Sequence, residues 1–304
     1  MKKILTLDLE RGWIRYAITT ETLDVLENGK KEIENTTESE AVFSVVDELA
    51  DMYRNQVDGI AMTLPGVIDY QNGIAYSGGM YKWVRNVPYA KIIEERTGLK
   101  TLIVNDAKAV GLAEAVYGSL RKTKRGIVLM LFSTGVGGAI IDQNAVISGA
   151  HFAAGEFSYI AGDYKERDDD GEDMFSQAVS INHLVEMVKE ETGNEHMNIM
   201  KLMRGISVSD PDVLKGVRRY CRMLAVFIYN IQAIEDVEQF SIGGSITDEA
   251  KFIDLIREAV HEKFEKAAYH NLFEPVIRGV SFHEDSRKYG AVHLFMKVKD
   301  NEND

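Results

Sequence analysis

Residues 5–20 read LTLDLERGWIRYAITT and predict two strands joined by a tight turn. Apolar and polar residues alternate through residues 4–9 and again through residues 13–20, and this period of two is typical of strands. A third short strand is expected at residues 23–26, which would complete a meander. Helices and buried strands then alternate along the chain, and that order predicts an α/β fold.

The second half of the chain repeats the plan of the first. Residues 127–148, IVLMLFSTGVGGAIIDQNAVIS, again predict strand, turn, strand, a short polar turn and a third strand. We therefore expect two domains of like plan with a cleft between them. The first domain comprises residues 1–117, completed by a C-terminal helix at about residues 285–304, and the second comprises residues 118–284.

Composition excludes several classes of protein. The net charge of −13 argues against nucleic-acid binding, which needs a clustered basic face. Cys221 is the only cysteine, so neither an internal disulfide nor a thiolate zinc cage can form within one chain. No apolar run approaches the ~20 residues that a membrane helix needs. We expect a soluble, cytoplasmic protein with no membrane or nucleic-acid partner.

Two glycine-rich segments predict where a nucleotide binds. STGVGG, residues 133–138, allows backbone amides to approach a phosphate closely and adds hydroxyl donors. FSIGGSIT, residues 240–247, ends a buried strand in glycines just before a helix, where the backbone can pass flat against a base and sugar. Each segment alone is also consistent with an ordinary turn. A strand follows residues 133–138, which disfavours a nicotinamide dehydrogenase because the dinucleotide fingerprint requires a helix there.

Two carboxylates are candidates for chemistry. Asp106 follows Asn105 at the end of a buried strand, where it could accept a proton from an alcohol that attacks phosphorus. The competing interpretation is that Asp106 caps the following helix while Asn105 holds the turn. Glu156 lies in HFAAGEFSY, where it could accept paired sugar hydroxyls beside an aromatic ring of Phe157 or Tyr159, or be an exposed loop residue.

Taken in order, the segments LDLERGWIR, GIAMTLPGVID, VNDAKAVGLAEAVYG, STGVGGAII, GAHFAAGEFSY and SIGGSIT resemble the sugar kinases and regulators of the ROK family, within the actin-like and hexokinase-like ATPase superfamily. The resemblance covers nearly the whole chain. It implies two domains with a duplicated βββαβα core and an interdomain cleft. It also implies ATP- and Mg²⁺-dependent phosphorylation of a hexose or glucose-like hydroxyl, as in glucokinases, fructokinases and β-glucoside kinases, and a homodimer.

The resemblance implies a role for each matching residue on the sugar side of the site. Asp106 would be the general base and Asn105 a sugar ligand. Glu156 would bind sugar hydroxyls, and Gly79 in GGMYKW would stand near the sugar through its backbone. Tyr159 occupies the place of a histidine found in zinc-containing members, and residues 163–179 have no cysteine, so the chain is similar to the zinc-free branch.

On the nucleotide side, the resemblance assigns the ATP phosphates and the adenosine to the glycine-rich segments. The phosphates would be held by Ser133, Thr134, Gly135, Gly137 and Gly138, and the adenosine would lie along Gly243 and Gly244. Asp8 would orient Mg²⁺ through water. Regulator members begin with a helix-turn-helix, whereas this sequence starts on the first predicted strand, which disfavours repression of DNA. The acidic run at residues 166–173, ERDDDGED, is expected to be a solvated loop and not a calcium site.

The first phosphate turn, residues 8–12, departs from the family pattern. The family reads D-x-G-G-T there, whereas this chain has Asp8, Leu9, Glu10, Arg11 and Gly12. Glu10 would repel a γ-phosphate unless it faces away or pairs with Arg11, and Arg11 could supply positive charge in place of backbone amides. Losing such donors commonly costs about a hundredfold or more in rate. The alternative function is therefore a sugar-binding sensor that has lost turnover.

Overall fold

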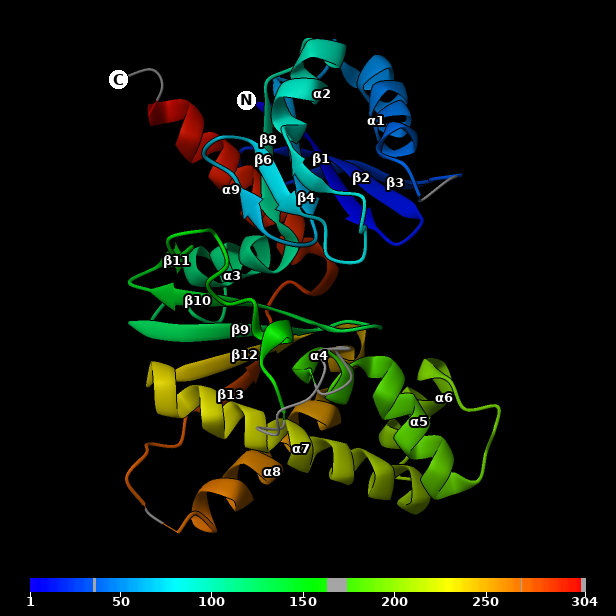
Figure 1. The fold of residues 1–304 in the computed structure, drawn as a ribbon, viewed down its shortest axis with the longest axis vertical. Coiled ribbons are helices and arrows are strands. Elements are labelled where there is room, and N and C mark those ends of the chain that lie inside the picture. The colour runs from blue at the N-terminus through cyan, green and yellow to red at the C-terminus, as the bar shows by residue number, and fades with distance from the viewer. Residues whose placement is uncertain (35–36, 163–173, 269, 302–304) are drawn as a thin grey trace. The chain divides into compact units, whose positions relative to one another are not determined.

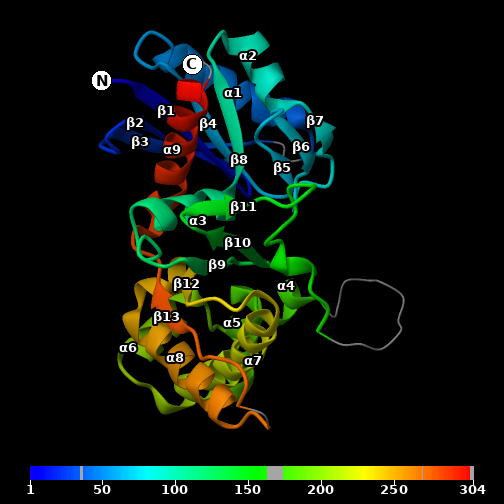
Figure 2. The same ribbon diagram turned by 90° about the vertical axis from the view of Figure 1, so that its left-hand side faces the viewer.

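The computed structural model describes residues 1–34, 37–162, 174–268 and 270–301. These residues fall into two compact units. Unit 1 comprises residues 1–114, 146–154 and 284–304, and unit 2 comprises residues 115–145 and 155–283. Each unit contains a mixed sheet with helices packed against it (Figures 1 and 2).

Five strands form the main sheet of unit 1, in the order β3-β2-β1-β4-β8. Their bounds are β1 Lys3–Glu10, β2 Trp13–Thr20, β3 Val25–Glu32, β4 Gly59–Leu64 and β8 Thr101–Asn105. β1 is antiparallel to β2 and parallel to β4, which is parallel to β8. The strands predicted at residues 4–9 and 13–20 are confirmed. The third strand starts at Val25 and not at residue 23, because Leu23 has a φ of 70° and lies in a turn.

Helices cover both faces of this sheet, and β1, β4 and β8 are accordingly buried along nearly their whole length. One face packs on α1 (Ser39–Tyr53) and α2 (Tyr89–Thr97), and the other on α3 (Asp106–Val116) and α9 (Ser286–Asn301). A small sheet follows β4 and consists of β5 Ile68–Asp69, β6 Ile74–Ser77 and β7 Arg85–Val87. α9 therefore returns to the first unit after the chain has built the second (Figure 1).

A second five-stranded sheet has the order β11-β10-β9-β12-β13. Its strands are β9 Arg125–Leu131, β10 Val136–Asp142, β11 Ala145–Ile147, β12 Gln239–Gly243 and β13 Val276–Gly279. In both sheets the first strand lies between the second and the fourth, and the fifth lies outside the fourth. The predicted duplicated α/β plan is confirmed.

Most of the helical residues of unit 2 lie between β10 and β13 in the sequence. The α-helices are α4 Phe175–Ala178, α5 Ile181–Thr192, α6 Ile199–Ser207, α7 Pro211–Glu235 and α8 Ala250–Glu265, and the 3-10 helices are η1 Phe157–Tyr159 and η2 Ser245–Asp248. A third 3-10 helix, η3 His283–Asp285, begins at the last residue of unit 2 and continues into unit 1. Asp210 caps α7 by accepting from the backbone N–H groups of Asp212 and Val213, and Pro211 starts the helix.

The parallel strands bring candidate residues to one edge of each sheet. In unit 1, Asp8 is in register with Thr63, and Leu64 with Asn105, so these residues lie at the carboxyl ends of neighbouring strands. In unit 2, Gly243 is in register with Met130, next to the turn that leads from β9 to β10. The carboxyl edge of a parallel sheet is where α/β proteins bind ligands.

The first prediction concerns how α9 docks in unit 1. A Cβ at Gly290 would overlap the carbonyl oxygen of Ala109 on α3, and this backbone atom cannot move aside. Gly290→Ala should therefore lower the free energy of unfolding by about 2–3 kcal/mol, the cost of overpacking a tight contact. Gly98→Ala is the control, because Gly98 has a φ of 71° but open space around it, and should cost about 1 kcal/mol. Urea unfolding measures both; an equal loss in the two variants would contradict the docking contact.

Candidate active site

Asp8, at the end of β1, is buried with both of its carboxylate oxygens bonded. The hydroxyl of Thr63 donates to Oδ1 at 2.5 Å, and Nη1 of Arg287 donates to Oδ2 at 2.6 Å. Thr63 reaches Asp8 because the two residues are in register on β1 and β4. Arg287 comes from the first turn of α9, so the first strand and the last helix of the described chain meet at this ion pair.

Glu10 also pairs with arginines, although not with the expected one. Nη1 of Arg287 lies 3.2 Å from its Oε1, and Nε of Arg15 lies 2.9 Å from its Oε2. The ion pairs of Glu10 among the described residues are with Arg287 and Arg15, and the alternative partner Arg11 has an exposed side chain. Arg11 occupies the two-residue turn that joins β1 to β2.

Tyr81 clamps the first phosphate turn. Its hydroxyl donates to the carbonyl oxygen of Glu10 at 2.5 Å and accepts from the N–H of Gly12 at 3.3 Å. Gly12 has a φ of 79° with open space around its Cα, so the turn requires glycine for its backbone conformation. Sequence analysis missed Tyr81, whose only signal was its place in the loop GGMYKW.

Asn105 and not Asp106 provides the cap of α3. Oδ1 of Asn105 accepts from the N–H of Lys108 at 2.9 Å, and its Nδ2 donates to the carbonyl oxygen of Gly66 at 2.9 Å. Asp106 is the first helical residue, and its Oδ1 accepts from the N–H of Ala107 at 2.7 Å. Asn105 therefore caps α3, and the interpretation of Asp106 as the cap is wrong. Asp106 lies at the carboxyl edge of the sheet.

The surroundings of Asp106 change its acidity. Burial raises the pKa of Asp106 to about 6, the positive charge of Arg287 opposes this rise, and the negative charge of Asp8 adds to it. A carboxylate with a pKa close to neutral is suited to accept a proton, because both of its protonation states are then accessible. Asp8, Asp106 and Arg287 therefore form one electrostatic group within unit 1.

Gly79 lies beside the same edge. It has a φ of 57°, is exposed, and a Cβ there would come within 3.3 Å of Cβ of Pro65 and 3.5 Å of the backbone nitrogen of Gly66. The carbonyl oxygen of Gly66 is the one that Asn105 binds. The structure thus brings together the predicted sugar residues Asn105 and Gly79.

In unit 2, the segment STGVGG divides into a turn and a strand. Ser133 and Thr134 are exposed in the turn, which is closed by the N–H of Phe132 donating to the carbonyl oxygen of Gly135 at 2.9 Å. Gly137 and Gly138 belong to β10 and pair with β9. The exposed donors of this segment are therefore concentrated at residues 133–135.

Gly138 is required for packing. A Cβ there would overlap the ring of Phe157 and would lie 2.7 Å from the carbonyl oxygen of Gly155. Phe157 is buried under β10, whereas Tyr159 is 58% exposed, so Tyr159 is the aromatic residue that can offer a face to a ligand. Glu156 is half-buried and immediately precedes η1, so the fit between Gly138 and Phe157 positions it.

Gly243 and Gly244 approach β9 closely. A Cβ at Gly243 would overlap Sδ of Met130, and one at Gly244 would overlap the carbonyl oxygen of Leu131. Gly244 also has a φ of 121°, which side chains rarely adopt. These glycines and residues 133–135 thus lie at the same edge of the second sheet.

The predicted residues form one group in each unit. Asp8, Asn105, Asp106 and Gly79 gather in unit 1, and the glycine segments, Glu156 and Tyr159 gather in unit 2. The expectation that Asp106 and Glu156 share one pocket stays a prediction, because the two residues belong to different units.

The described residues offer neither a cluster of metal ligands nor a membrane-spanning helix. They contain no group of three or more His, Cys, Asp and Glu side chains that could hold a metal ion. No helix among them is long and apolar enough to cross a membrane. The acidic run at residues 166–173 and most of the segment without cysteine lie outside the described residues, so their expected roles stay predictions.

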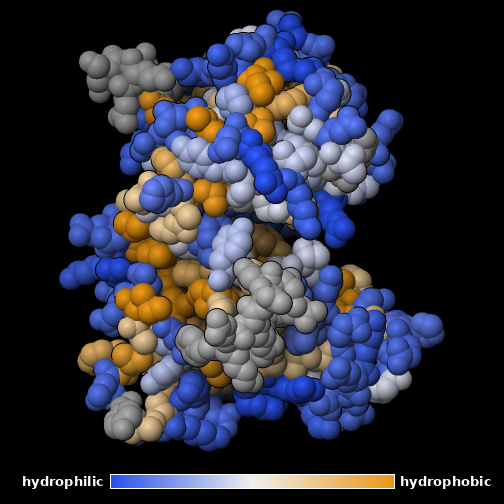
Figure 3. All heavy atoms as spheres, in the orientation of Figure 1, coloured by the Kyte–Doolittle hydropathy of each residue, from blue (hydrophilic) through white to orange (hydrophobic). Residues whose placement is uncertain are grey.

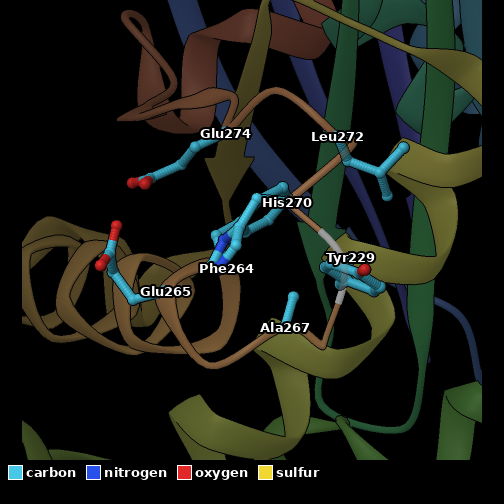
Figure 4. A pocket seen from close by; sticks show the side chains of 7 residues that line it. All are labelled: Tyr229, Phe264, Glu265, Ala267, His270, Leu272 and Glu274. Carbon is cyan, nitrogen blue, oxygen red and sulfur yellow. The ribbon is translucent and has the colours of Figure 1, made fainter.

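A small pocket lies in unit 2 near the end of α8 (Figure 4). Its lining comprises Tyr229, Phe264, Glu265, Ala267, His270, Leu272 and Glu274. It contains none of the predicted site residues. The face drawn in Figure 3 is largely hydrophilic with hydrophobic side chains gathered in places, and the exposed apolar residues of unit 2 include Ile234 and Phe273, which are 77% and 82% exposed.

The second prediction tests the clamp on the first phosphate turn. Tyr81→Phe removes the hydroxyl that bonds Glu10 and Gly12, and should lower the free energy of unfolding by about 1–2 kcal/mol, because the half-buried carbonyl of Glu10 loses its partner. Tyr159→Phe is the matched control, since Tyr159 is exposed, and should change stability by less than about 0.5 kcal/mol. Urea unfolding compares the two variants. Equal stability of Tyr81→Phe and wild type would mean that the hydroxyl does not hold the turn.

Comparisons with known proteins agree with this architecture. The sequence model of the ROK family matches residues 4–298. A β-glucoside kinase of Klebsiella pneumoniae is 26% identical over 258 residues, which cover 84% of this chain and 86% of that protein. A ROK family protein of Streptococcus pneumoniae in complex with sucrose has the same fold, with a TM-score of 0.81 at 24% identity, over 98% of this chain and 99% of that one.

A ROK family glucokinase of Streptomyces griseus, solved in complex with glucose and AMPPNP, also shares the fold. Its TM-score is 0.80 at 18% identity, over 96% of this chain and 98% of that one. The predicted hexokinase-like fold is confirmed. Because the family match extends over nearly the whole sequence and the duplicated sheets agree with it, the chain belongs to the ROK family.

Proposed function

We propose that this ROK protein is an ATP-dependent sugar kinase that phosphorylates a hydroxyl of a hexose or glucose-like sugar. The observation that carries the proposal is the placement of Asp106. It stands at the carboxyl edge of the first sheet, at the start of α3. Burial raises its pKa to about 6, and the charges of Asp8 and Arg287 also act on it. The similarity to a β-glucoside kinase supports the substrate class.

In the proposed reaction, Asp106 takes the proton of the sugar hydroxyl as the hydroxyl oxygen attacks the γ-phosphorus of ATP. The new oxygen–phosphorus bond forms while the bond to the bridging oxygen breaks, and ADP leaves with that electron pair. Asp106 then releases its proton to solvent. Asn105 and Gly79 would position the sugar from unit 1, and Glu156 and Tyr159 would bind it from unit 2.

The residues at the first phosphate turn fit a hydrated Mg²⁺ that arrives with ATP. Mg²⁺ keeps several waters and needs only one or two carboxylates besides the phosphates. Asp8 is the buried carboxylate at that place, and each of its oxygens, although bonded to Thr63 or Arg287, has a second lone pair for a metal-bound water. When bound, Mg²⁺ would neutralise phosphate charge. The ATP phosphates would meet Ser133 to Gly138, and the adenosine would lie along Gly243 and Gly244.

Two features of the first phosphate turn favour the second candidate function, a sugar-binding sensor without turnover. The backbone N–H of Gly12 already donates to the hydroxyl of Tyr81, and the carboxylate of Asp8 already accepts from Arg287, so both groups have a partner within the protein. A sensor would bind a hexose in calorimetry but not ATP with Mg²⁺. A kinase would bind both.

The remaining family expectations are part of the proposal. They are domains at residues 1–117 with about 285–304 and at residues 118–284, a cytoplasmic location, no zinc, no nucleic-acid partner and a homodimer. The exposed Ile234 and Phe273 support association with another protein surface.

The third prediction is the activity itself. A coupled ADP-release assay over hexoses and β-glucosides should show turnover that depends on one of these sugars. Asp106→Asn should lower kcat by about 10²–10⁴-fold, because it removes the base while keeping the shape. Asp254→Asn, an exposed change on α8, is the control and should keep full activity. Absence of sugar-dependent turnover above that of Asp106→Asn would refute the kinase proposal.

The fourth prediction follows from the pKa of Asp106, which burial raises to about 6. A general base must be deprotonated, so kcat/KM should fall tenfold per pH unit well below pH 6 and level off above pH 7. Measuring kcat/KM of the wild-type enzyme between pH 5 and 8 tests this predicted fall at acidic pH. A profile that is flat down to pH 5 would show that Asp106 does not titrate in the reaction.

A further inference from the structure

Arg287 pairs with both carboxylates of the first phosphate turn, Asp8 and Glu10. Its guanidinium is buried, with 17% of the side chain exposed, and its Nη1 reaches Asp8 at 2.6 Å and Glu10 at 3.2 Å. Its field also acts on Asp106. Each of these carboxylates belongs to the edge where the proposed phosphoryl transfer takes place, and α9 delivers the arginine to all of them.

Glu10 creates the need for this cation. Where the family has a glycine, Glu10 adds a carboxylate beside Asp8 and Asp106, and uncompensated negative charge there would repel the phosphates of ATP. The guanidinium of Arg287 lies between Asp8 and Glu10 and is within bonding distance of both, so it compensates the added charge where it arises.

We propose that Arg287 is a positioning residue for phosphoryl transfer: by holding Glu10 and Asp8 together, it cancels the charge that Glu10 brings to the first phosphate turn and so admits the terminal phosphate of ATP. This inference rests on the proposed function. It assigns Glu10 and Arg287 as a matched pair, in which Glu10 hinders the binding of the terminal phosphate when Arg287 is absent.

Arg15 provides a matched control. It bonds the other oxygen of Glu10 at 2.9 Å, but its side chain is 48% exposed and its second partner, Glu284, is 77% exposed. Solvent screens such a pair strongly. Arg15 makes no ion pair with Asp8 among the described residues, so it shares the contact with Glu10 but not the burial or the second carboxylate.

The experiment measures the affinity of the full-length protein for AMPPNP and for ADP, both with Mg²⁺, by calorimetry. The ratio of the two affinities reports the terminal phosphate. Arg287→Gln should weaken AMPPNP binding at least tenfold and reduce its preference over ADP, whereas Arg15→Gln should change either affinity less than twofold. Arg287→Lys should recover part of the loss, because it restores the charge but not the fork that spans both carboxylates.

Removal of Glu10 tests the pair independently. Glu10→Gln should tighten AMPPNP binding severalfold, since Arg287 then faces one carboxylate fewer, and it keeps the bond of Arg287 to Asp8. Glu10→Gln with Arg287→Gln should bind AMPPNP more tightly than Arg287→Gln alone. If Arg287→Gln fails to fold, as the melting temperature would show, the Glu10→Gln arm still decides the proposal. A purely structural role would lower the melting temperature without moving the AMPPNP-to-ADP ratio.

Equal affinities for Arg287→Gln and Arg15→Gln would overturn the inference, as would no gain in Glu10→Gln or no binding of AMPPNP by the wild type. The proposed function fails separately, through absence of sugar-dependent ADP release by the wild type. If turnover occurs while Arg287→Gln behaves as Arg15→Gln does, the kinase stands and the matched pair is refuted. If the affinity pattern holds without turnover, the pair stands and the kinase is refuted.

Discussion

The bond between Arg287 and Asp8 is the interaction on which the first unit's functional edge depends. It joins a carboxylate at the end of the first strand to a guanidinium in the first turn of the last helix, 279 residues away. Breaking a buried ion pair by removing one partner typically costs about 3–5 kcal/mol, because a charge is left without compensation. The same bond therefore holds α9 on the sheet and balances the charge of Asp8 at the first phosphate turn.

The remaining candidate residues depend on sheet geometry. Parallel β1, β4 and β8 bring Asp8, Thr63 and Asn105 to one edge, and the same strand order in the second sheet brings the end of β12 beside the turn after β9. Several glycines of these segments serve packing at the same time. Gly138 makes room for Phe157, and Gly244 for the backbone of Leu131, so the segments predicted to bind the nucleotide are also closely packed.

Sequence predicted the α/β class, the duplicated plan and the strands at residues 4–9 and 13–20, because alternating apolar residues are a local signal. The role of Arg287 could not be found this way, since nothing in EDSRKYG indicates that its arginine meets a strand at the other end of the chain. For the same reason the ion pairs of Glu10 with Arg287 and Arg15 could not be read from the sequence. Asn105 and Asp106 are both good capping residues, and only the observed start of α3 decides between them. How Asp106 lies relative to Glu156 depends on the placement of the two units and not on either local sequence.

The return of α9 to the first unit also affects biosynthesis. The core of that unit includes Ile4 and Val104 from the sheet and Val292 and Phe295 from α9. A ribosome releases the β-strands long before it has made the helix that covers them, whereas all of unit 2 has been translated by then. During translation one apolar face of the nascent first sheet is therefore covered by α3 alone, and the unit that is made first is completed last.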